Sequence, residues 1–360
     1  MRILMMDEFS RMGGGQELFL DVYSALKEKH ELSLITNVSF RNDIYFHNVN
    51  RTSYSYHEGL NVISLYFQVM RLKKEISTIM RNANYDLVFN NHPNIFLFKS
   101  DINYLHGFSF LDPVIDENGK ITNNLIYLII KSSGIYKIYN DANFFTHGKY
   151  TMELSKKMFP NLSIRPRSMD YANTPVSEFI NVNISEKEDF VLTFGRINVY
   201  KNLEIVLKTA EKLREIKFVI AGAVYKGDES YVRMLKKNVP RNVKIVENPD
   251  EIEKKKLFMK AKVYFHTNKK EHYGVTVAEA ISFGCVPVVP ESGGPWIDIA
   301  EKGKFGFGYR GEPEEVIKVA LGAGKEMIKT IYESRERFSF STFKEKILNY
   351  FDKIANEKGI

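Results

Sequence analysis

The sequence predicts an α/β protein of two similar domains, each a parallel sheet covered by helices. Short apolar segments alternate with segments whose apolar residues recur at helical spacing, which is the pattern of alternating strands and helices. The same alternation starts again at residue 190. With 360 residues, the chain is long for a single core and of ordinary length for two domains.

Composition and charge restrict the class of protein. The hydrophobic fraction of 44% and the charged fraction of 26% are those of an ordinary globular protein. The net charge of +7 suits anionic ligands and does not single out nucleic acid. The one cysteine, Cys285, excludes a disulfide within the chain, and its apolar surroundings predict a place in the core. We see no signal peptide and no membrane-spanning apolar run, so we expect a cytoplasmic protein.

The N-terminal half contains five predicted strands and two predicted helices. The strands are expected at residues 2–6, 31–36, 86–89, 102–105 and 143–146, and the helices at residues 16–29 and 149–159. Because the two kinds of segment alternate, we expect a parallel sheet with helices on both faces. This half is predicted to form a domain over residues 1–176.

The C-terminal half repeats this build. Strands are expected at residues 190–194, 217–221, 243–246, 263–266 and 286–289, with helices at residues 203–213 and around Glu279. These elements predict a second domain over residues 189–339, with a polar linker at 177–188. Ligands of open α/β sheets sit beyond the carboxyl ends of the strands, so we expect the two domains to face one another across a ligand-binding cleft.

Two glutamates, Glu271 and Glu279, stand on either side of Gly274 at the start of a predicted helix. A glycine there lets a ligand approach bare backbone amides, and the helix N-terminus favours a phosphate. The two carboxylates can accept hydrogen bonds from hydroxyl groups on either side of it. The segment therefore suggests a nucleotide-sugar, which has a diphosphate between two sugars. Two surface glutamates spaced by chance are the alternative.

Arg196 and Lys201 lie in the loop that follows the first strand of the second domain. A guanidinium and an ammonium group suit phosphate oxygens. They would stabilise the charge that develops on a departing diphosphate. A solvated basic turn is the alternative.

Three further loops follow predicted strands. Residues 13–15 are glycines that open the first helix and could cradle an anion, or could form a flexible loop; a dinucleotide fingerprint fits poorly. Residues 293–295, Gly-Gly-Pro, form either a ligand-facing turn or a plain turn. His106 follows the strand at 102–105, where it could exchange a proton or have a structural role. No sequence of the metal-binding kind appears, so we expect neither a catalytic metal nor a cofactor.

These residues together resemble the retaining glycosyltransferases of family 4, which have the GT-B fold of two Rossmann-like, doubly wound domains. The resemblance is strongest over residues 190–308. The family signature, two glutamates separated by seven residues, matches Glu271 and Glu279. The resemblance implies that Glu271 contacts the transferred sugar and Glu279 the ribose. It also implies that Arg196 and Lys201 bind the diphosphate.

The resemblance extends to other positions. It implies that Gly14 and Gly15 lie near the diphosphate, that His106 lies near the transferred sugar, and that residues 273–275 (Tyr273, Gly274 and Val275) contact the donor. It further implies that the final helix, residues 340–360, packs back onto the N-terminal domain. The chain departs from the family pattern at Tyr273, where phenylalanine is usual, at residues 247–249, where a glycine is frequent, and at residues 147–148.

We therefore expect a retaining, metal-free glycosyltransferase that moves a hexose from a nucleoside diphosphate sugar to an acceptor hydroxyl. The acceptor could be a glycan, a lipid or another molecule. A nucleotide-sugar epimerase, a phosphorylase and a non-catalytic nucleotide-sugar-binding module are the alternatives. Residues 125–139 suit either an interfacial helix at the inner membrane surface or, as we favour, a core helix.

Overall fold

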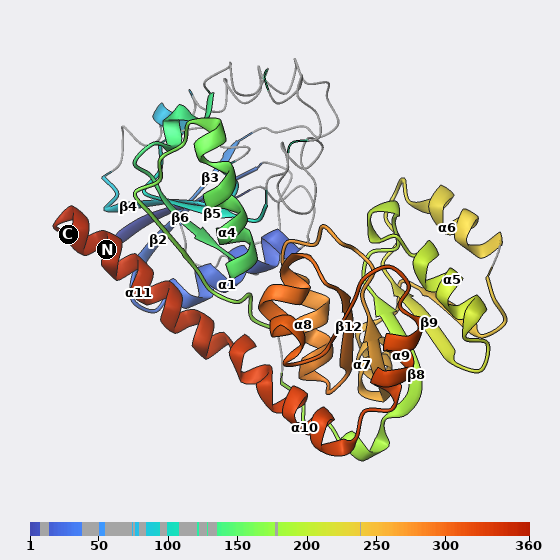
Figure 1. Ribbon diagram of the computed structural model, residues 1–360. Coiled ribbons are helices and arrows are strands. Elements are labelled where there is room, and N and C mark those ends of the chain that lie inside the picture. Colours follow the sequence, from blue (N-terminus) through green and yellow to red (C-terminus); the bar gives the residue numbers. More distant parts are fainter. Residues whose placement is uncertain are drawn as a thin grey trace. The chain divides into compact units, whose positions relative to one another are not determined.

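The computed structural model (Figure 1) describes most of the chain. The described residues are 1–7, 14–37, 50–54, 74, 76–78, 84–93, 99–107, 121, 128, 135–176, 179–237 and 239–360. The chain divides into two compact units, Met1–Pro175 with Phe340–Ile360, and Val176–Ser339. The helix expected at residues 125–139 lies mostly outside the described residues, and its end forms the 3-10 helix η2 (Ile135–Tyr139).

The first unit contains a fully parallel sheet. Over the described residues its strand order is β3-β2-β1-β4-β5-β6-β7. The strands are β1 (Arg2–Met6), β2 (Glu31–Asn37), β3 (Asn50–Tyr54), β4 (Leu87–Asn90), β5 (Ile102–Leu105), β6 (Asn143–Thr146) and β7 (Ser168–Tyr171). The order reverses between β1 and β4, the switch point at which doubly wound sheets bind ligands.

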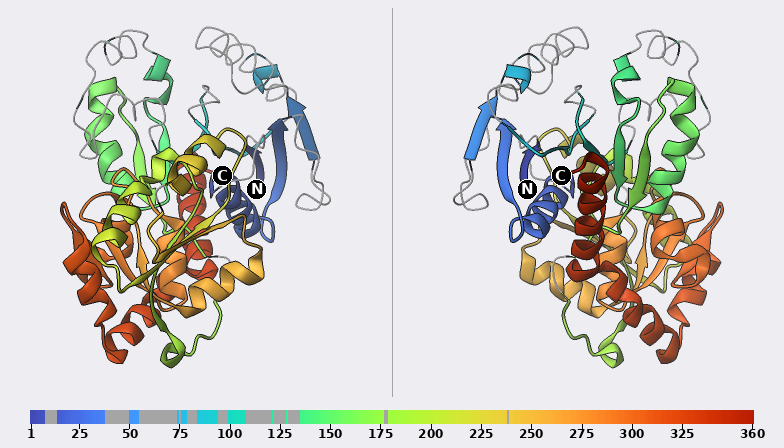
Figure 2. Two further views of the ribbon diagram at one scale, coloured as in Figure 1. Left: turned by 90° about the vertical axis from the view of Figure 1, so that its right-hand side faces the viewer. Right: turned by 90° about the vertical axis from the view of Figure 1, so that its left-hand side faces the viewer.

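Helices α1 (Gly14–Leu26), α4 (Lys149–Met158) and α11 (Phe340–Lys358) belong to this unit. Helix α11 runs beside α1 in Figures 1 and 2, and the two contact one another. Phe351 of α11 packs on Phe89 of β4, with ring centroids 5.8 Å apart. At the other end, the Lys358 ammonium donates to the Asp86 carbonyl at 2.8 Å and contacts the Asp101 carboxylate at 2.9 Å. The final helix is therefore built into the core of the first unit.

The second unit contains another parallel sheet. Its described strands run in the order β10-β9-β8-β11-β12-β13. They are β8 (Glu188–Phe194), β9 (Lys217–Gly222), β10 (Val243–Glu247), β11 (Ala261–Phe265), β12 (Val286–Pro290) and β13 (Phe307–Tyr309). Counted within the unit, this is the 3-2-1-4-5-6 order of the Rossmann fold, with its switch point between β8 and β11.

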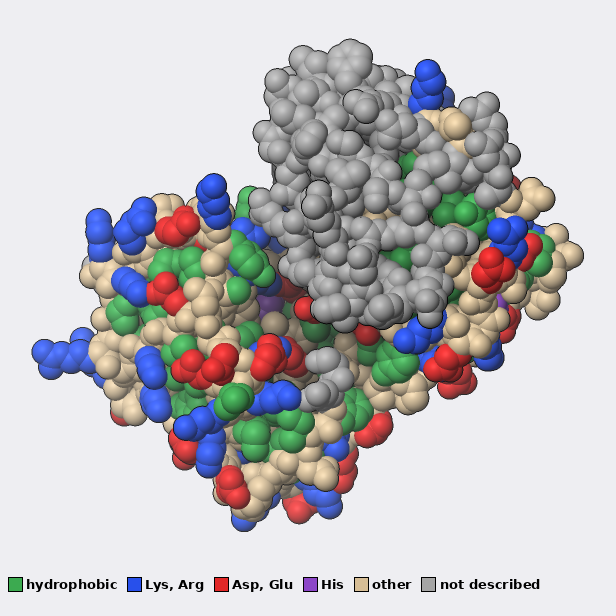
Figure 3. All heavy atoms as spheres, turned by 180° about the vertical axis from the view of Figure 1, so that it is seen from behind, with side chains coloured by type: hydrophobic (Ala, Val, Ile, Leu, Met, Phe, Trp, Pro, Cys, Tyr) green, Lys and Arg blue, Asp and Glu red, His purple; other side chains and the backbone are tan. Residues whose placement is uncertain are grey.

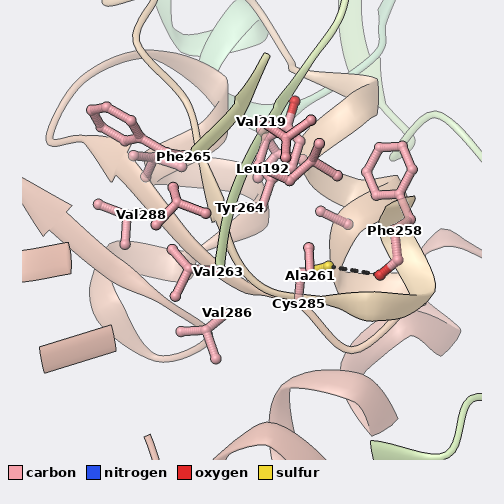
Figure 4. Close-up of a cluster of buried hydrophobic side chains, with 14 of the residues drawn as sticks. Leu192, Val219, Phe258, Ala261, Val263, Tyr264, Phe265, Cys285, Val286 and Val288 are labelled. Atoms are coloured by element: carbon pink, nitrogen blue, oxygen red, sulfur yellow. Dashed lines mark hydrogen bonds between the residues drawn. The ribbon is translucent and has the colours of Figure 1, made fainter. Parts of the chain in front are cut away.

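Helices cover this second sheet. They are α5 (Glu204–Lys212), α6 (Glu229–Lys237), α7 (Glu251–Lys260), α8 (Val275–Ser282), α9 (Glu314–Leu321) and α10 (Lys325–Glu333), with short turns such as η5 (Val199–Lys201) and η6 (Pro295–Ile299). Cys285 lies in the core, as expected, and its thiol points to the Phe258 carbonyl at 3.3 Å (Figure 4).

The predicted strands are all present, with shifted ends. Strand β11 ends at Phe265, so His266, predicted as its last residue, is the first residue beyond it. The predictions omitted β3, β7 and β13, which are short or polar segments at or near sheet edges. Within the expected linker, Phe179, Ile180 and Val182 pack against the core of the second unit.

The surface of the second unit carries both signs of charge. Figure 3 shows Lys and Arg side chains interspersed with Asp and Glu over the coloured part of the face it presents. Among the described residues, no helix combines the length and the apolar character needed to cross a membrane.

Candidate active site

Arg196 and Lys201, two of the predicted site residues of the second unit, lie at the switch point between β8 and β11. A pocket opens there, beyond the carboxyl ends of β8, β9 and β11. It is lined by Thr193, Phe194, Gly195, Arg196, Lys201, Leu203, Ile220, Ala221, His266 and Thr267. The pocket therefore joins the basic loop after β8 to the loop after β11.

Two glycines allow the basic loop to turn close to the sheet. Gly195 has φ +151° and Gly222 has φ +153°, a region that side chains rarely adopt. A Cβ on Gly222 would lie 1.6 Å from the Gly195 carbonyl oxygen. The Gly195 amide donates to the Ala221 carbonyl at 3.0 Å. This backbone contact fixes the start of the loop that carries both cations.

Arg196 is fixed in place by a hydrogen bond from its guanidinium Nε. Its Nε donates to Asp228 at 2.7 Å, and the group lies over the Tyr225 ring at 4.9 Å from the centroid. No hydrogen bond within the described chain occupies its terminal nitrogens. An arginine fixed through Nε presents a preorganised fork to an anion. Asp228 and Tyr225 position Arg196 but were missed in the sequence, because they lie about thirty residues away.

Lys201 closes the basic loop and forms an ion pair with Glu271. The lysine ammonium donates to Glu271 Oε2, and the Lys201 carbonyl accepts from the Thr267 hydroxyl. The Asn268 amide also contacts Glu271 Oε2, at 3.4 Å. Oε1 of Glu271 has no hydrogen-bond partner among the described residues, so it can accept from a ligand hydroxyl.

The surroundings of Glu271 keep it ionised. Burial acts to raise its pKa, but the charges of Lys201 and His266 and the Lys201 hydrogen bond outweigh burial and lower its pKa to about 2. A carboxylate can only accept hydrogen bonds, so the site favours hydroxyl donors at this point.

His266 is a pocket residue that was not predicted as functional. It is 4% exposed and its Nε2 lies 3.8 Å from Glu271 Oε2. Burial lowers its pKa to about 4, opposed by Glu271 and reinforced by Lys201. The signal in the sequence that could have indicated a functional residue is its position at the end of a predicted strand. The predicted strand at residues 263–266 includes His266 itself, so the residue was not assigned to the following loop.

The predicted Gly-Gly-Pro turn supports the Glu271 loop. The Gly294 amide donates to the Glu271 carbonyl at 2.9 Å. A Cβ on Gly294 would lie 2.2 Å from the His272 carbonyl oxygen, so a larger residue would push the loop away. Gly274 is the N-cap of α8 with φ +94°, and its Cβ would lie 2.9 Å from Pro295 Cγ.

Glu279 occupies the second turn of α8 and faces a different cation. Its Oε1 lies 2.6 Å from the ammonium of Lys254 in α7, which sits over the Phe194 ring at 5.7 Å. The two signature glutamates are thus paired with separate lysines. Lys254 was missed in the sequence, where it belongs to a run of three lysines typical of a solvated helix face.

Two predicted donor contacts differ in how they can act. The Tyr273 side chain is 3% exposed and belongs to the hydrophobic core, so a ligand could meet this residue only through its backbone. Val275 is the first residue of α8, and its amide lies among the orphan donors of the helix N-terminus. Tyrosine at position 273 is therefore accommodated as a core residue.

Asn248 explains one departure from the expected pattern. It follows β10 with φ +49°, the left-handed conformation that glycine adopts freely and that asparagine tolerates. Its side-chain oxygen accepts from the Val224 amide at 2.8 Å. Asn248 thus adopts a left-handed backbone conformation at the position where a glycine is frequent in the family.

The first unit also gathers polar residues at its switch point, between β1 and β4. Asp7 is fully buried and lies 2.9 Å from His92 Nε2. Asn91 donates to both Asp7, at 3.1 Å, and the Gly15 carbonyl, at 3.2 Å. Gly14 and Gly15 are the first residues of α1, which begins two residues earlier than predicted. The start of α1 is therefore tied to the Asp7–His92 pair.

His106 stands in the middle of a ladder of histidines. His92, His106 and His147 follow the adjacent strands β4, β5 and β6, with ring centroids 5.0 and 6.1 Å apart. Burial, followed by the charges of His92 and His147, holds the pKa of His106 well below its usual range. The His106 side chain is therefore neutral near pH 7. Within the described residues no three acidic, histidine or cysteine side chains are arranged to hold a metal ion.

The sequence of the second unit matches a known family. Residues 177–322 fit the family model of glycosyl transferases group 1, and the match spans nearly all of this unit. The C-terminal unit belongs to the glycosyl transferases group 1 family. The residues that line its pocket thus lie in a glycosyltransferase domain.

Curated relatives agree with this family. The chain is 27% identical over 193 residues to a GDP-Man:Man(3)GlcNAc(2)-PP-Dol alpha-1,2-mannosyltransferase of Dictyostelium discoideum, covering 48% of the chain and 38% of the relative. It is 23% identical over 167 residues to a glycogen synthase of Clostridium kluyveri, covering 46% of the chain and 34% of the relative. The chain thus matches little more than a third of each relative's length.

Solved glycosyltransferases share the fold over the whole chain. Anabaena HepE, solved with UDP and glucose, has a TM-score of 0.69 at 15% identity and covers 98% of this chain and 100% of its own. Sucrose-phosphate synthase of Thermosynechococcus elongatus has a TM-score of 0.71 at 12% identity, covering 98% of each chain. The expected GT-B fold is confirmed.

Proposed function

We propose that the protein is a retaining glycosyltransferase that moves a hexose from a nucleoside diphosphate sugar to an acceptor hydroxyl without a catalytic metal. The single observation that carries the proposal is that Arg196 and Lys201 line one pocket at the switch point of the family domain, and that Lys201 also forms an ion pair with Glu271. Two cations suit a diphosphate, and the open carboxylate oxygen of Glu271 suits a sugar hydroxyl.

The residues would act mainly by charge stabilisation and positioning. As the bond between the anomeric carbon and the diphosphate breaks, Arg196 and Lys201 stabilise the charge on the leaving group. The acceptor oxygen then bonds to the anomeric carbon on the face that the diphosphate leaves, and its proton passes to a leaving phosphate oxygen. We propose that Glu271, which contacts Lys201 and Asn268 in the structure, orients the sugar through hydrogen bonds and does not act as a covalent nucleophile.

The remaining predicted residues have supporting roles in the proposal. Glu279, one turn inside α8, would accept from ribose hydroxyls, with Lys254 fixing its direction. The amides of Gly274 and Val275 at the start of α8 would meet the diphosphate. In the first unit, Gly14 and Gly15 would approach the diphosphate, and neutral His106 would hydrogen-bond the sugar.

We propose a glycan or lipid-linked acceptor and a cytoplasmic protein with peripheral membrane contact. These proposals draw on the dolichol-linked glycan named for the mannosyltransferase relative and on the absence of a membrane-crossing helix in the described residues. Co-sedimentation with anionic liposomes tests the membrane contact. Recovery of the protein only in the supernatant would contradict it.

Assays with UDP-glucose and GDP-mannose test the reaction. Proton NMR of the first product formed would show an α-linked product from these α-linked donors, and a β-linked product would contradict retention. Lys201→Ala and Glu279→Ala should each reduce donor turnover by about 10- to 100-fold or more, the usual effect of losing one charged contact. Unchanged donor binding in both variants would contradict the assignment of Lys201 and Glu279 to the donor site.

Two other functions make different predictions from the same pocket. An epimerase would convert a donor to its epimer without any acceptor, and a phosphorylase would require phosphate. A non-catalytic module would bind donors saturably but turn none over. The presence of both cations, Arg196 and Lys201, with the two glutamates favours an enzyme over a non-catalytic module.

A further inference from the structure

His266 lies where it can respond to the binding of a ligand. It is the first residue beyond β11 and it lines the same pocket as Lys201. Its Nε2 is buried without a hydrogen-bond partner and faces Glu271 Oε2 at 3.8 Å. The backbone of Asn268 hydrogen-bonds to the ring. A buried unpaired nitrogen beside a carboxylate is costly unless some state of the protein uses it.

In the proposed reaction the Lys201 ammonium has two competing partners, the Glu271 carboxylate and the diphosphate. In the structure the ammonium pairs with Glu271. A diphosphate in the pocket attracts the same ammonium, so its attraction to Glu271 weakens. The Glu271 side chain is only 22% exposed, and a largely buried carboxylate that loses its cation is strongly destabilised. Another positive charge is needed beside Glu271 when the donor is bound.

We infer that His266 takes up a proton from solvent when a nucleoside diphosphate sugar binds, and that its imidazolium then replaces Lys201 as the partner of Glu271. This inference rests on the proposed function. His266 would be a positioning residue, because it holds Glu271 in place for the sugar while Lys201 serves the diphosphate. The proposal makes donor binding pH-dependent through a residue that does not contact the diphosphate.

The direction of the coupling follows from the charges around the ring. The groups acting on His266 are Glu271, Lys201 and the Asn268 backbone, and the Tyr309 hydroxyl reaches only its carbonyl. A bound diphosphate offsets the Lys201 charge, which opposes protonation of His266, and frees the Glu271 charge, which favours it. Both changes raise the pKa of His266 above the value of about 4 that its surroundings in the structure give it. Proton uptake is therefore expected between about pH 4 and the raised pKa, and it vanishes at lower and at higher pH.

Calorimetric titration can count the protons. UDP-glucose and GDP-mannose are titrated into the full chain at about pH 6, in two buffers of different ionisation enthalpy, where His protonation changes are detectable. Intact nucleotide-sugars are preferred to UDP, because a terminal phosphate has its own pKa of about 6. The wild-type protein should take up a substantial fraction of one proton per donor bound.

Two variants and one control separate positioning from simple structural damage. His266→Gln keeps an N–H group within reach of Glu271 and cannot titrate, so it should bind donor with little loss but without proton uptake. His266→Ala should bind more weakly. His30→Gln removes a histidine of the first unit whose pKa is also lowered, and it should leave the uptake unchanged.

Donor binding without proton uptake in the wild type, or with equal uptake in His266→Gln, would overturn the inference and leave the proposed function standing. Failure of both donors to bind would overturn the proposed function together with the inference.

Discussion

Lys201 and Glu271 come from loops seventy residues apart and form an ion pair at the edge of the pocket. The lysine is 29% exposed and the glutamate 22%. The loop after β8 that carries Lys201 and the loop before α8 that carries Glu271 are thus joined by a charge contact. This contact makes the resting site electrically balanced, and a ligand must compete with it.

Removing one member of this pair should destabilise the free protein. Lys201→Met leaves Glu271 without its cation and should lower the free energy of unfolding by about 1–3 kcal/mol. The double variant Lys201→Met/Glu271→Gln should recover much of this loss, because the unpaired charge is gone. Denaturant unfolding measures both. Lys329→Met, in an exposed pair with Glu333, is the matched control, and an equal loss there would contradict the prediction.

Gly222 should tolerate no side chain. In Gly222→Ala the new Cβ would meet the Gly195 carbonyl oxygen at 1.6 Å, so β9 or the basic loop must move. We expect a loss of about 3 kcal/mol or more, or failure to fold. Gly14→Ala has open space around its Cβ at the start of α1 and should change stability by less than about 1 kcal/mol. Equal melting temperatures for the two variants would contradict the close approach of the two backbones.

Arg337 should be a main anchor of the segment that leads to α11. Its guanidinium donates to the Asp298 and Ile299 carbonyls, at 3.3 and 3.0 Å, pairs with Glu301, and lies over the Phe305 ring. Arg337→Ala should lower stability by about 2–4 kcal/mol, because a partly buried network loses its centre. Arg310→Ala removes an exposed arginine that also pairs with a glutamate, and it should cost less than about 1 kcal/mol in thermal unfolding. A similar cost for both would argue against an anchoring role.

Acid should destabilise the second unit in two steps. The pKa of His266 is lowered to about 4 from an ordinary 6.5, so the unfolded chain binds its proton first and stability falls as pH drops from 6.5 towards 4. The pKa of Glu271 is lowered from 4.5 to about 2, so the stability that ionised Glu271 contributes is lost as the pH falls from about 4.5 to about 2. Melting curves from pH 7.5 to 4 should show a decline that is shallower in His266→Gln. Parallel curves would refute a neutral buried His266.

The sequence predicted most of the fold because strands and helices of an α/β sheet leave periodic apolar patterns. Edge strand β3 has a polar sequence and left no such pattern. The cations and carboxylates in strand-following loops could be found because parallel strands end at one edge of the sheet. The residues that pair with them, such as Asp228 and Lys254, could not be found in this way. They reach the site from helices or loops whose local sequence pattern indicates only solvent exposure. The contacts between His92, His106 and His147 could not be predicted either. They arise because β4, β5 and β6 are neighbours in the sheet, and the sequence does not show this strand order.

We propose that Arg196, Lys201 and Glu271 form a nucleotide-sugar site. The most direct measurement is calorimetric titration of the wild type and Lys201→Ala with UDP-glucose and GDP-mannose at about pH 8, where histidine protonation contributes little. We expect the wild type to bind at least one donor saturably, and Lys201→Ala to bind it about tenfold or more weakly, because one charged contact to the diphosphate is lost. Binding of equal strength in both proteins, or no binding of either donor, would contradict it.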